Sequence, residues 1–501
     1  MDLLTGLAIG LETALSPTNL LYCFLGTLLG TLIGVLPGVG ATATVALLLP
    51  ITFSLDPATS VIMLAGIYYG AQYGGSTTAI LINLPGEATS VVTALDGHQM
   101  ALQGRAGVAL ATAALGSFFA GTVATFFIIL LAGPLTTVAL NFGTPDYFSL
   151  IVLGLVFSVT LAHGSVLKAV GMVLVGLLFG LVGMDMYTGL ERFTLGQMAL
   201  MNGIDFVAVA LGLFGLAEIL RNLEDEKTRE LVVRRVEGLM PTREDLRKMF
   251  MPIVRGTMLG SILGVLPGGT ATLSSFAAYT LEKKVSKHPE EFGKGALAGV
   301  AGPESANNAA AQTSFIPMLT LGIPSNPIMA LMIGALIVHG ITPGPNVVNQ
   351  SPSLFWGLIV SMWTANGMLV LLNLPLIGVW VRLLSVPYNA LIPAIVAFSV
   401  VGIYGVNSNA FDLYTVAFFG VFGYVAAKLG CEPAPLVLGF ILGPLLEEYF
   451  RRAMALSGGD PTIFVRTPIS AVLLLLAVLA FVAILVPAIR SKREETFEQG
   501  D

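Results

Sequence analysis

Two clusters of small polar side chains are the parts of this chain best suited to chemistry, because each surrounds a Pro-Gly turn inside an apolar segment. Glycine lets the backbone turn tightly and lets a ligand approach it closely. A helix that restarts after such a turn exposes free N–H groups and the positive end of its dipole, which suits a carboxylate. We therefore predict an organic anion site at Pro37, Gly38, Gly40 and Thr42 in the first cluster and at Pro267, Gly268, Gly269, Thr270 and Thr272 in the second.

A second polar segment follows each turn. Residues 61–83 are interrupted at 73–78, and residues 295–321 are interrupted at 301–308. We predict that both segments are helices broken near the middle of a membrane, where freed backbone groups and polar side chains meet a ligand. The candidate substrate contacts, which we expect to be counterparts, are Ser76, Thr77 and Thr78 in the first segment and Asn307 and Asn308 in the second.

Glu304 is an ionisable residue inside an apolar region, and the cost of burying such a residue indicates a function by default. Two interpretations stay open: the carboxylate binds a cation or carries a proton, or it caps a helix that begins near Ser305. Carbonyl, hydroxyl and amide oxygens at helix breaks suit Na⁺. The candidate cation region comprises Thr44, Asn83, Ser274, Glu304, Gln312 and Asn326.

An internal repeat connects these clusters. The thirteen residues 26–38 return at 256–268, with nine positions identical and a constant separation of 230. Duplicated halves with interrupted hydrophobic segments at matching positions are typical of secondary transporters, whose site lies at the interface of the repeats.

Composition limits the fold to a membrane protein. The 501 residues are 55% hydrophobic and 11% charged, and several apolar runs approach the length that crosses a bilayer. Because backbone groups inside a bilayer must be satisfied internally, we predict an all-α polytopic protein with roughly 10–14 transmembrane or re-entrant helices. The net charge of −6 without a basic stripe argues against nucleic acid as a partner.

Other functional classes lack support in the sequence. Cys23 and Cys431 lie in apolar surroundings and are expected to pack rather than to bind metal or form a disulfide. No zinc-protease, serine-hydrolase or Walker motif is present, so we expect neither an enzyme nor an ATP-driven pump. No positively charged start of a signal peptide precedes the first apolar run. The polar residues 96–105 are expected to form a connecting loop, with a gate as the alternative.

Basic residues predict the topology. Residues 221–250, the loop 283–294 and the tail 490–501 are rich in Lys and Arg, and the positive-inside rule places them in the cytoplasm. The second repeat has basic residues on both flanks, which favours a re-entrant hairpin over a single crossing. The first repeat has none, so we expect it to enter from the other face. Pro-kinked spanning helices are the alternative.

The predicted organisation is two inverted-topology repeats joined by a charged linker. The boundaries are an N-terminal repeat at 1–220 with a hairpin at 20–53 and a broken helix at 61–83, a cytoplasmic linker at 221–250, a C-terminal repeat at 251–489 with a hairpin at 252–281 and a broken helix at 295–321, and a cytoplasmic tail at 490–501. The remaining helices are expected to form a scaffold.

Several motifs in order, at residues 34–38, 71–76, 83–86, 96–99 and 302–308, resemble the large, TctA-like membrane subunit of the bacterial tripartite tricarboxylate transporters. The resemblance covers nearly the whole chain. It implies a multi-pass protein of the bacterial inner membrane that works with a small membrane subunit and a periplasmic substrate-binding protein. It also implies uptake of an organic di- or tricarboxylate such as citrate, driven by a gradient of Na⁺ (or H⁺), with no other cofactor. Paired hairpins are similar to those of transporters with an elevator motion.

A passive anion channel or pore is the alternative function. A channel would be expected to form a symmetric ring of chains around a shared pore. Internally duplicated hairpins place the site within one chain, which favours a transporter.

Overall fold

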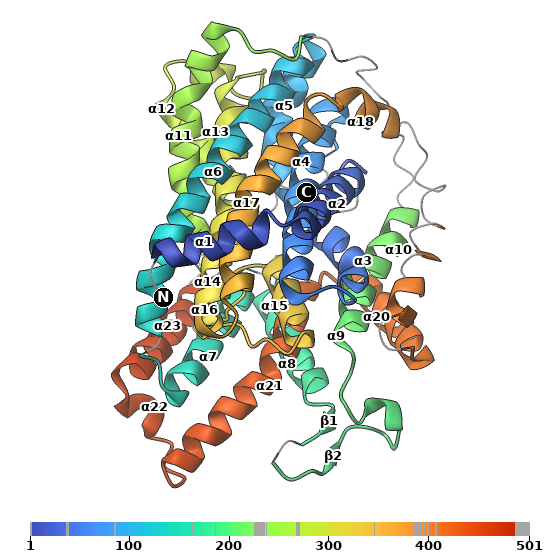
Figure 1. Cartoon of the computed structure of the whole chain (residues 1–501), viewed down its shortest axis with the longest axis vertical. Helices are drawn as coiled ribbons and strands as arrows, with labels where there is room; N and C mark the ends of the chain where they lie inside the picture. Colours follow the sequence, from blue (N-terminus) through green and yellow to red (C-terminus); the bar gives the residue numbers. More distant parts are fainter. Residues whose placement is uncertain are drawn as a thin grey trace.

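The computed structural model of the chain describes residues 3–36, 40–84, 87–139, 141–161, 165–185, 187–224, 236, 238–266, 271–344, 346–384, 393, 396–397, 400–405 and 408–485. Figure 1 shows a bundle of helices, with a small two-stranded sheet at the end remote from α5 and α12. The linker core at 225–235 and the tail at 486–501 lie outside the described residues.

The first half is built from helices and one short sheet. Its elements are α1 (Leu3–Ala14), α2 (Pro17–Gly34), α3 (Ala41–Thr52), α4 (Pro57–Ile82), η1 (Ala88–Ser90), α5 (Val91–Leu102), α6 (Ala106–Ala139), α7 (Thr144–Leu161), α8 (Val166–Gly180), β1 (Gly183–Met184), β2 (Glu191–Arg192), η2 (Met198–Leu200), α9 (Phe206–Ala210), the π-helix η3 (Leu211–Leu216) and α10 (Ala217–Glu224).

The second half is helical throughout its described residues. Its elements are α11 (Arg243–Val265), α12 (Ala271–Val285), η4 (Pro289–Glu291), α13 (Ala298–Thr313), α14 (Phe315–Leu321), α15 (Pro327–Val338), α16 (Val347–Gln350), α17 (Pro352–Asn373), α18 (Ile377–Leu383), α20 (Ala410–Lys428), α21 (Pro433–Leu456), α22 (Ile463–Arg466) and α23 (Pro468–Leu485).

The architecture confirms an all-α polytopic membrane protein. Within the described residues, five helical stretches are long and apolar enough to cross a bilayer: Pro17–Gly34, Ala106–Leu131, Phe206–Glu224, Pro352–Asn373 and Ala410–Lys428. Shorter apolar helices, among them α3, α8 and α15, accompany them. Backbone hydrogen bonds inside helices satisfy the peptide groups, as a bilayer requires.

Glycine at every fourth position brings α2 against α4. A Cβ atom on Gly26, Gly30 or Gly34 would lie only 2.2–2.4 Å from the backbone oxygens of Met63, Ile67 and Ala71, respectively. Small residues let membrane helices approach this closely, and the contact gains dispersion energy and polar backbone contacts. The residue numbers rise together along the two helices, so α2 and α4 run parallel.

The same contact returns in the second half. A Cβ atom on Gly256, Gly260 or Gly264 of α11 would lie at the same 2.2–2.4 Å from the backbone oxygens of Gly302, Ala306 and Ala310 on α13. The glycines repeat after 230 residues, whereas their partners repeat after 239. The nine extra residues fall between α12 and α13.

The separation of 239 continues beyond the glycine contacts. Asn83, which ends α4 with φ of 56°, corresponds to Gly322, which ends α14 with φ of 72°. Glu87, the N-cap residue of η1, corresponds to Asn326, the N-cap residue of α15. Helix α4 is therefore the counterpart of α13 and α14 together. The expected pairing of residues 76–78 with Asn307 and Asn308 is wrong, because Asn307 and Asn308 correspond to Tyr68 and Tyr69.

The predicted helix breaks at 73–78 and 301–308 are also wrong. Helix α4 is continuous to Ile82, and α13 is continuous through Asn308 and gives way to α14 only at Ser314. The hydroxyls of Ser76, Thr77 and Thr78 bond back to the carbonyls four residues earlier, at 3.1–3.2 Å, so they use the intact helix rather than interrupting it.

The helices that precede the two Pro-Gly segments, α2 and α11, run in opposite directions. Ser76 on α4 bonds Glu304 on α13, and one turn further along α4 Ile80 lies level with Val300, since both contact the Cβ position of Gly97. Residue numbers therefore rise on α4 as they fall on α13, and the helices are antiparallel. Because α2 runs parallel to α4 and α11 runs parallel to α13, α2 and α11 are antiparallel too.

An ion pair joins the arms of the second hairpin. The guanidinium of Arg255 on α11 donates to both carboxylate oxygens of Glu282 on α12, at 2.8 and 2.6 Å, and Glu282 is 2% exposed. Such a bidentate pair is strong and fixes the geometry of the two groups. It holds α11 and α12 together at the end of the hairpin away from the turn.

The small sheet is fixed to α21 by a cluster of charges. Asp185 accepts the N–H groups of Tyr187 and Thr188 at 2.8 and 2.9 Å and pairs with Arg451 at 3.0 Å. The N–H group of Thr188 contributes most to holding the pKa of Asp185 down at about 2. Arg192 on β2 joins Glu447 on α21 at 2.8 Å.

Gly260→Ala tests the close helix contact. The new Cβ would meet the Ala306 carbonyl, so we expect the free energy of unfolding to fall by about 1–3 kcal/mol. The matched control is Gly171→Ala on α8, where nothing lies within 4 Å, and it should leave stability unchanged or raise it slightly. Thermal unfolding of the detergent-solubilised chain measures both. Equal effects would contradict the packing.

Candidate functional site

The Glu304 carboxylate lies where both halves of the molecule meet. It is 1% exposed, and Ser76 on α4 donates to its two oxygens at 2.8 and 2.9 Å. Thr93 on α5 donates a very short hydrogen bond to Oε1. Glu304 is the seventh residue of α13. The expected capping of a helix that begins near Ser305 is therefore wrong, and the carboxylate is held by side chains of the other half.

A small pocket opens beside this carboxylate. Its polar lining consists of Tyr73, Ser76, Thr77, Ser117, Glu304 and Asn373, from helices α4, α6, α13 and α17. The Tyr73 hydroxyl and the Asn373 carbonyl oxygen are buried and lack a hydrogen-bond partner within the described residues. The pocket measures about 20 Å³, close to the 10–15 Å³ that one water molecule needs. It has room for a water molecule or a small ion and not for an organic carboxylate.

Asn308 and Gln312 extend the polar face of α13 that the sequence predicts. The Asn308 amide donates to Ser117 on α6 at 2.6 Å and to the Glu304 carbonyl at 3.0 Å. Gln312 accepts from Thr125 on α6 at 2.9 Å. Both side chains already have protein partners, so their observed role is to join α13 to α6.

Asn307 is the buried polar group that stands out. It is 0% exposed, and neither its amide nitrogen nor its oxygen has a hydrogen-bond partner within the described residues. Helix α12 passes this face of α13 in antiparallel register, since Tyr279 meets Gly299 and Ser275 lies 3.4 Å from the Pro303 carbonyl. One turn further, Asn307 is level with the start of α12. Leaving a buried amide without a hydrogen bond costs about 1–3 kcal/mol, so Asn307 is a candidate for contact with a ligand.

The structure places only part of each Pro-Gly turn. Pro37 and Gly38 of the first turn and Pro267, Gly268, Gly269 and Thr270 of the second lie outside the described residues. Gly40 is the N-cap residue of α3, and Thr42 and Thr272 occupy matching, half-buried positions in the first turns of α3 and α12. Helices α3 and α12 therefore begin at Ala41 and Ala271, directly after the two Pro-Gly segments of the sequence.

The remaining candidates have local structural partners. Thr44 bonds the Gly40 carbonyl at 3.0 Å, and Thr78 reaches the Val35 carbonyl at the end of α2 at 2.9 Å. Asn326 caps α15 by accepting the Met329 N–H at 2.9 Å. Asn83 is exposed, and Ser274 is buried in α12.

Sequence reasoning missed most of the groups around Glu304. Thr93, Ser117 and Asn373 come from helices that the sequence predicts only as packing elements or connectors. The acidic residue Asp96 was the signal in the sequence that could have pointed to this region. It lies on α5 rather than in the expected loop and is 0% exposed. Its carboxylate accepts hydrogen bonds from the N–H groups of Gly293, Gly295 and Ala296 at 2.7–2.9 Å. This acceptor holds α5, and with it Thr93, against the start of α13.

The comparisons with known proteins place the chain in a transporter family. The family model "Tripartite tricarboxylate transporter TctA family" matches residues 20–438. The chain belongs to this family. The TctA family forms the large membrane subunit of three-part transporters, which implies a small membrane subunit and a periplasmic binding protein as partners and the inner membrane as the location.

Two relatives come from Agrobacterium vitis. An "Uncharacterized 52.8 kDa protein in TAR-I ttuC' 3'region" is 64% identical over 501 residues, the whole of both chains. An "Uncharacterized protein in TAR-II ttuC' 3'region" is 60% identical over 242 residues, which is 48% of this chain and the whole of the relative. No solved structure matches the chain significantly.

Asn307→Leu tests whether the free amide serves a ligand rather than the fold. Without ligand, we expect the free energy of unfolding to stay unchanged or to rise by about 1 kcal/mol, because an unmet buried amide is removed. The matched control is Asn308→Leu, which removes two hydrogen bonds and should cost about 1–3 kcal/mol. Thermal unfolding in detergent compares them, and a large loss for Asn307→Leu would show a structural role.

Proposed function

We propose that this TctA-family subunit carries an organic di- or tricarboxylate such as citrate into the cell, driven by an inward Na⁺ gradient. The periplasmic binding protein delivers the substrate, and the small membrane subunit assists. The observation that carries the proposal is the buried amide of Asn307 on α13. It has no hydrogen-bond partner within the described residues and lies level with the start of α12. It supplies a donor where a helix N-terminus also favours an anion.

The oppositely directed hairpins supply the rest of the substrate site. Thr42 and Thr272 stand in the first turns of α3 and α12, where hydroxyls and free N–H groups can bind carboxylate oxygens. Arg255 is the one basic residue within 252–281, and it already forms an ion pair with Glu282. A polyanion bound by neutral groups needs cations beside it, which supports coupling to Na⁺.

The packing also suggests which part moves. Helices α2, α4, α11 and α13 form two tight pairs joined through Glu304. Helices α7, α8 and α21 share an apolar cluster around Ile151, Val173 and Leu442, and α23 packs on α7. We propose an elevator motion in which the helix pairs α2–α4 and α11–α13 carry the substrate past this scaffold.

Citrate uptake into proteoliposomes tests the proposal. With the small subunit and the binding protein present, radiolabelled citrate should accumulate only with an inward Na⁺ gradient, and Asn307→Leu should abolish accumulation while the protein stays folded. Flux that needs neither the gradient nor the binding protein would contradict coupled transport and favour a passive pore.

Cysteine labelling tests the proposed orientation. A single cysteine introduced in the linker, as Arg234→Cys in a chain with Cys23 and Cys431 replaced by Ala, should resist an impermeant thiol reagent in intact cells and react after the membrane is opened. Leu195→Cys in the same background, at an exposed position just after β2, should react with the reagent in intact cells. The reverse pattern would overturn the topology.

A further inference from the structure

We propose that the pocket beside Glu304 is a Na⁺ site, separate from the carboxylate-binding turns. Tyr73, Ser76, Ser117, Glu304 and Asn373 line it, and Thr93 donates to the Glu304 carboxylate. The inference rests on the proposed ion-coupled transport and assigns the coupling ion to residues. Three of these six side chains, Thr93, Ser117 and Asn373, lie outside the polar runs that the sequence singles out.

The chemistry of the lining is that of a hard cation site. One carboxylate, hydroxyls and an amide oxygen face the pocket, and these are the oxygen donors that hard cations prefer. The Tyr73 hydroxyl lies close enough to Ser117 to interact with it, but neither this hydroxyl nor the Asn373 amide oxygen meets the geometry of a hydrogen bond within the described residues. Two buried oxygens left free beside a carboxylate point to a bound species.

The charge of the pocket selects a monovalent ion. Within the described part of the chain, the partners of Glu304 are hydroxyl groups, and no Lys, Arg or His forms an ion pair with it. An unpaired carboxylate in an apolar bundle is expensive, and one cation of single charge would neutralise it. The pocket volume of about 20 Å³ admits one such ion.

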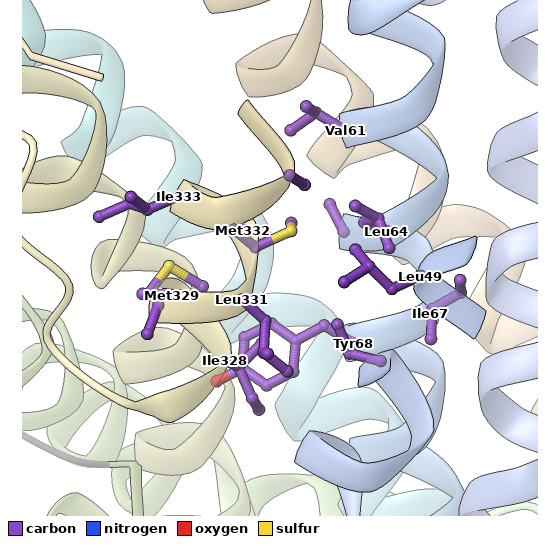
Figure 2. Packing of buried hydrophobic residues seen from close by; sticks show 14 of the residues in the cluster. Leu49, Val61, Leu64, Ile67, Tyr68, Ile328, Met329, Leu331, Met332 and Ile333 are labelled. Atoms are coloured by element: carbon purple, nitrogen blue, oxygen red, sulfur yellow. The ribbon is translucent and has the colours of Figure 1, made fainter. Parts of the chain in front are cut away.

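The three residues that form the hydrogen bonds of the Glu304 carboxylate have apolar counterparts in the repeat. Counting back or forward by 239 residues, Glu304 corresponds to Ala65, Ser76 to Phe315 and Thr93 to Met332, all of them buried and apolar. Figure 2 shows Met332 directed from α15 toward Leu64 on α4 within this apolar cluster. The site is therefore a departure from the repeat, and we expect one such Na⁺ per chain.

The pocket is joined to both substrate turns by short paths. On α4, Thr78 lies two residues beyond Ser76 and donates a hydrogen bond to the carbonyl of Val35, the C-cap residue of α2. On α13, Asn308 bonds both Ser117 and the Glu304 carbonyl, and its neighbour Asn307 faces the start of α12. An ion that draws Glu304, Ser76 and Ser117 together would fix α4 and α13 relative to each other before the carboxylate binds.

Sodium binding can be measured on the full chain without substrate. In detergent at constant ionic strength, with choline replacing Na⁺, we expect Na⁺ to raise the unfolding temperature saturably, and ²²Na⁺ to bind by scintillation proximity. Glu304→Gln should lose both signals. Tyr73→Phe, which keeps the ring and removes one oxygen, should raise the half-saturating Na⁺ concentration about fivefold. Glu87→Gln, a neighbouring carboxylate outside the pocket lining, is the matched control and should bind as the wild type does.

The outcomes separate the two proposals. If wild-type uptake depends on Na⁺ but Glu304→Gln and Tyr73→Phe bind Na⁺ normally, the site is wrong and the transport proposal stands. If ²²Na⁺ binds as assigned but uptake is independent of Na⁺, the site stands and the coupling fails. Stabilisation by low pH with no Na⁺ binding would replace the cation site with a proton site. Should Glu304→Gln fail to fold, Tyr73→Phe alone decides.

Discussion

The close approach of two helix backbones, once in each half, is the constraint on which the rest of the structure depends. Gly30 against Ile67 and Gly260 against Ala306 leave no room for a Cβ atom. In a bilayer, where apolar contact between helices gains little over contact with lipid, such packing supplies much of the association energy. It fixes α4 beside α2 and α13 beside α11, and so decides which faces remain for chemistry.

Those remaining faces meet around a single carboxylate. Helix α4 contributes Ser76, α5 contributes Thr93 and α13 contributes Glu304, so hydroxyls of one half stabilise the charge of the other. The duplicated positions Ala65 and Met332 kept apolar packing instead. One half of a symmetric frame thus serves as core while the other carries a costly polar group, an arrangement that gives a transporter chemical asymmetry within symmetric packing.

The two proposed sites differ in chemistry. Asn307 lies level with the N-terminus of α12, a neutral environment that suits an anion. The pocket at Glu304 has a carboxylate, hydroxyls and an amide oxygen in its lining, which suit a cation. The two lie on neighbouring turns of α13, so binding at one changes the environment of the other without any long pathway.

The sequence by itself determined the class of the protein, its duplication and its polar positions, since hydropathy, glycine spacing and the repeat at 26–38 are local properties of the chain. Glu304, Asn307 and Asn308 were identified because polar residues in an apolar run are visible in one dimension. Only the tertiary structure decided that α4 and α13 are unbroken, because hydroxyls can satisfy a helix as readily as interrupt it. It also decided the partners of Glu304, since Ser76 and Thr93 lie far from it in the chain and reach it only when helices of both halves pack.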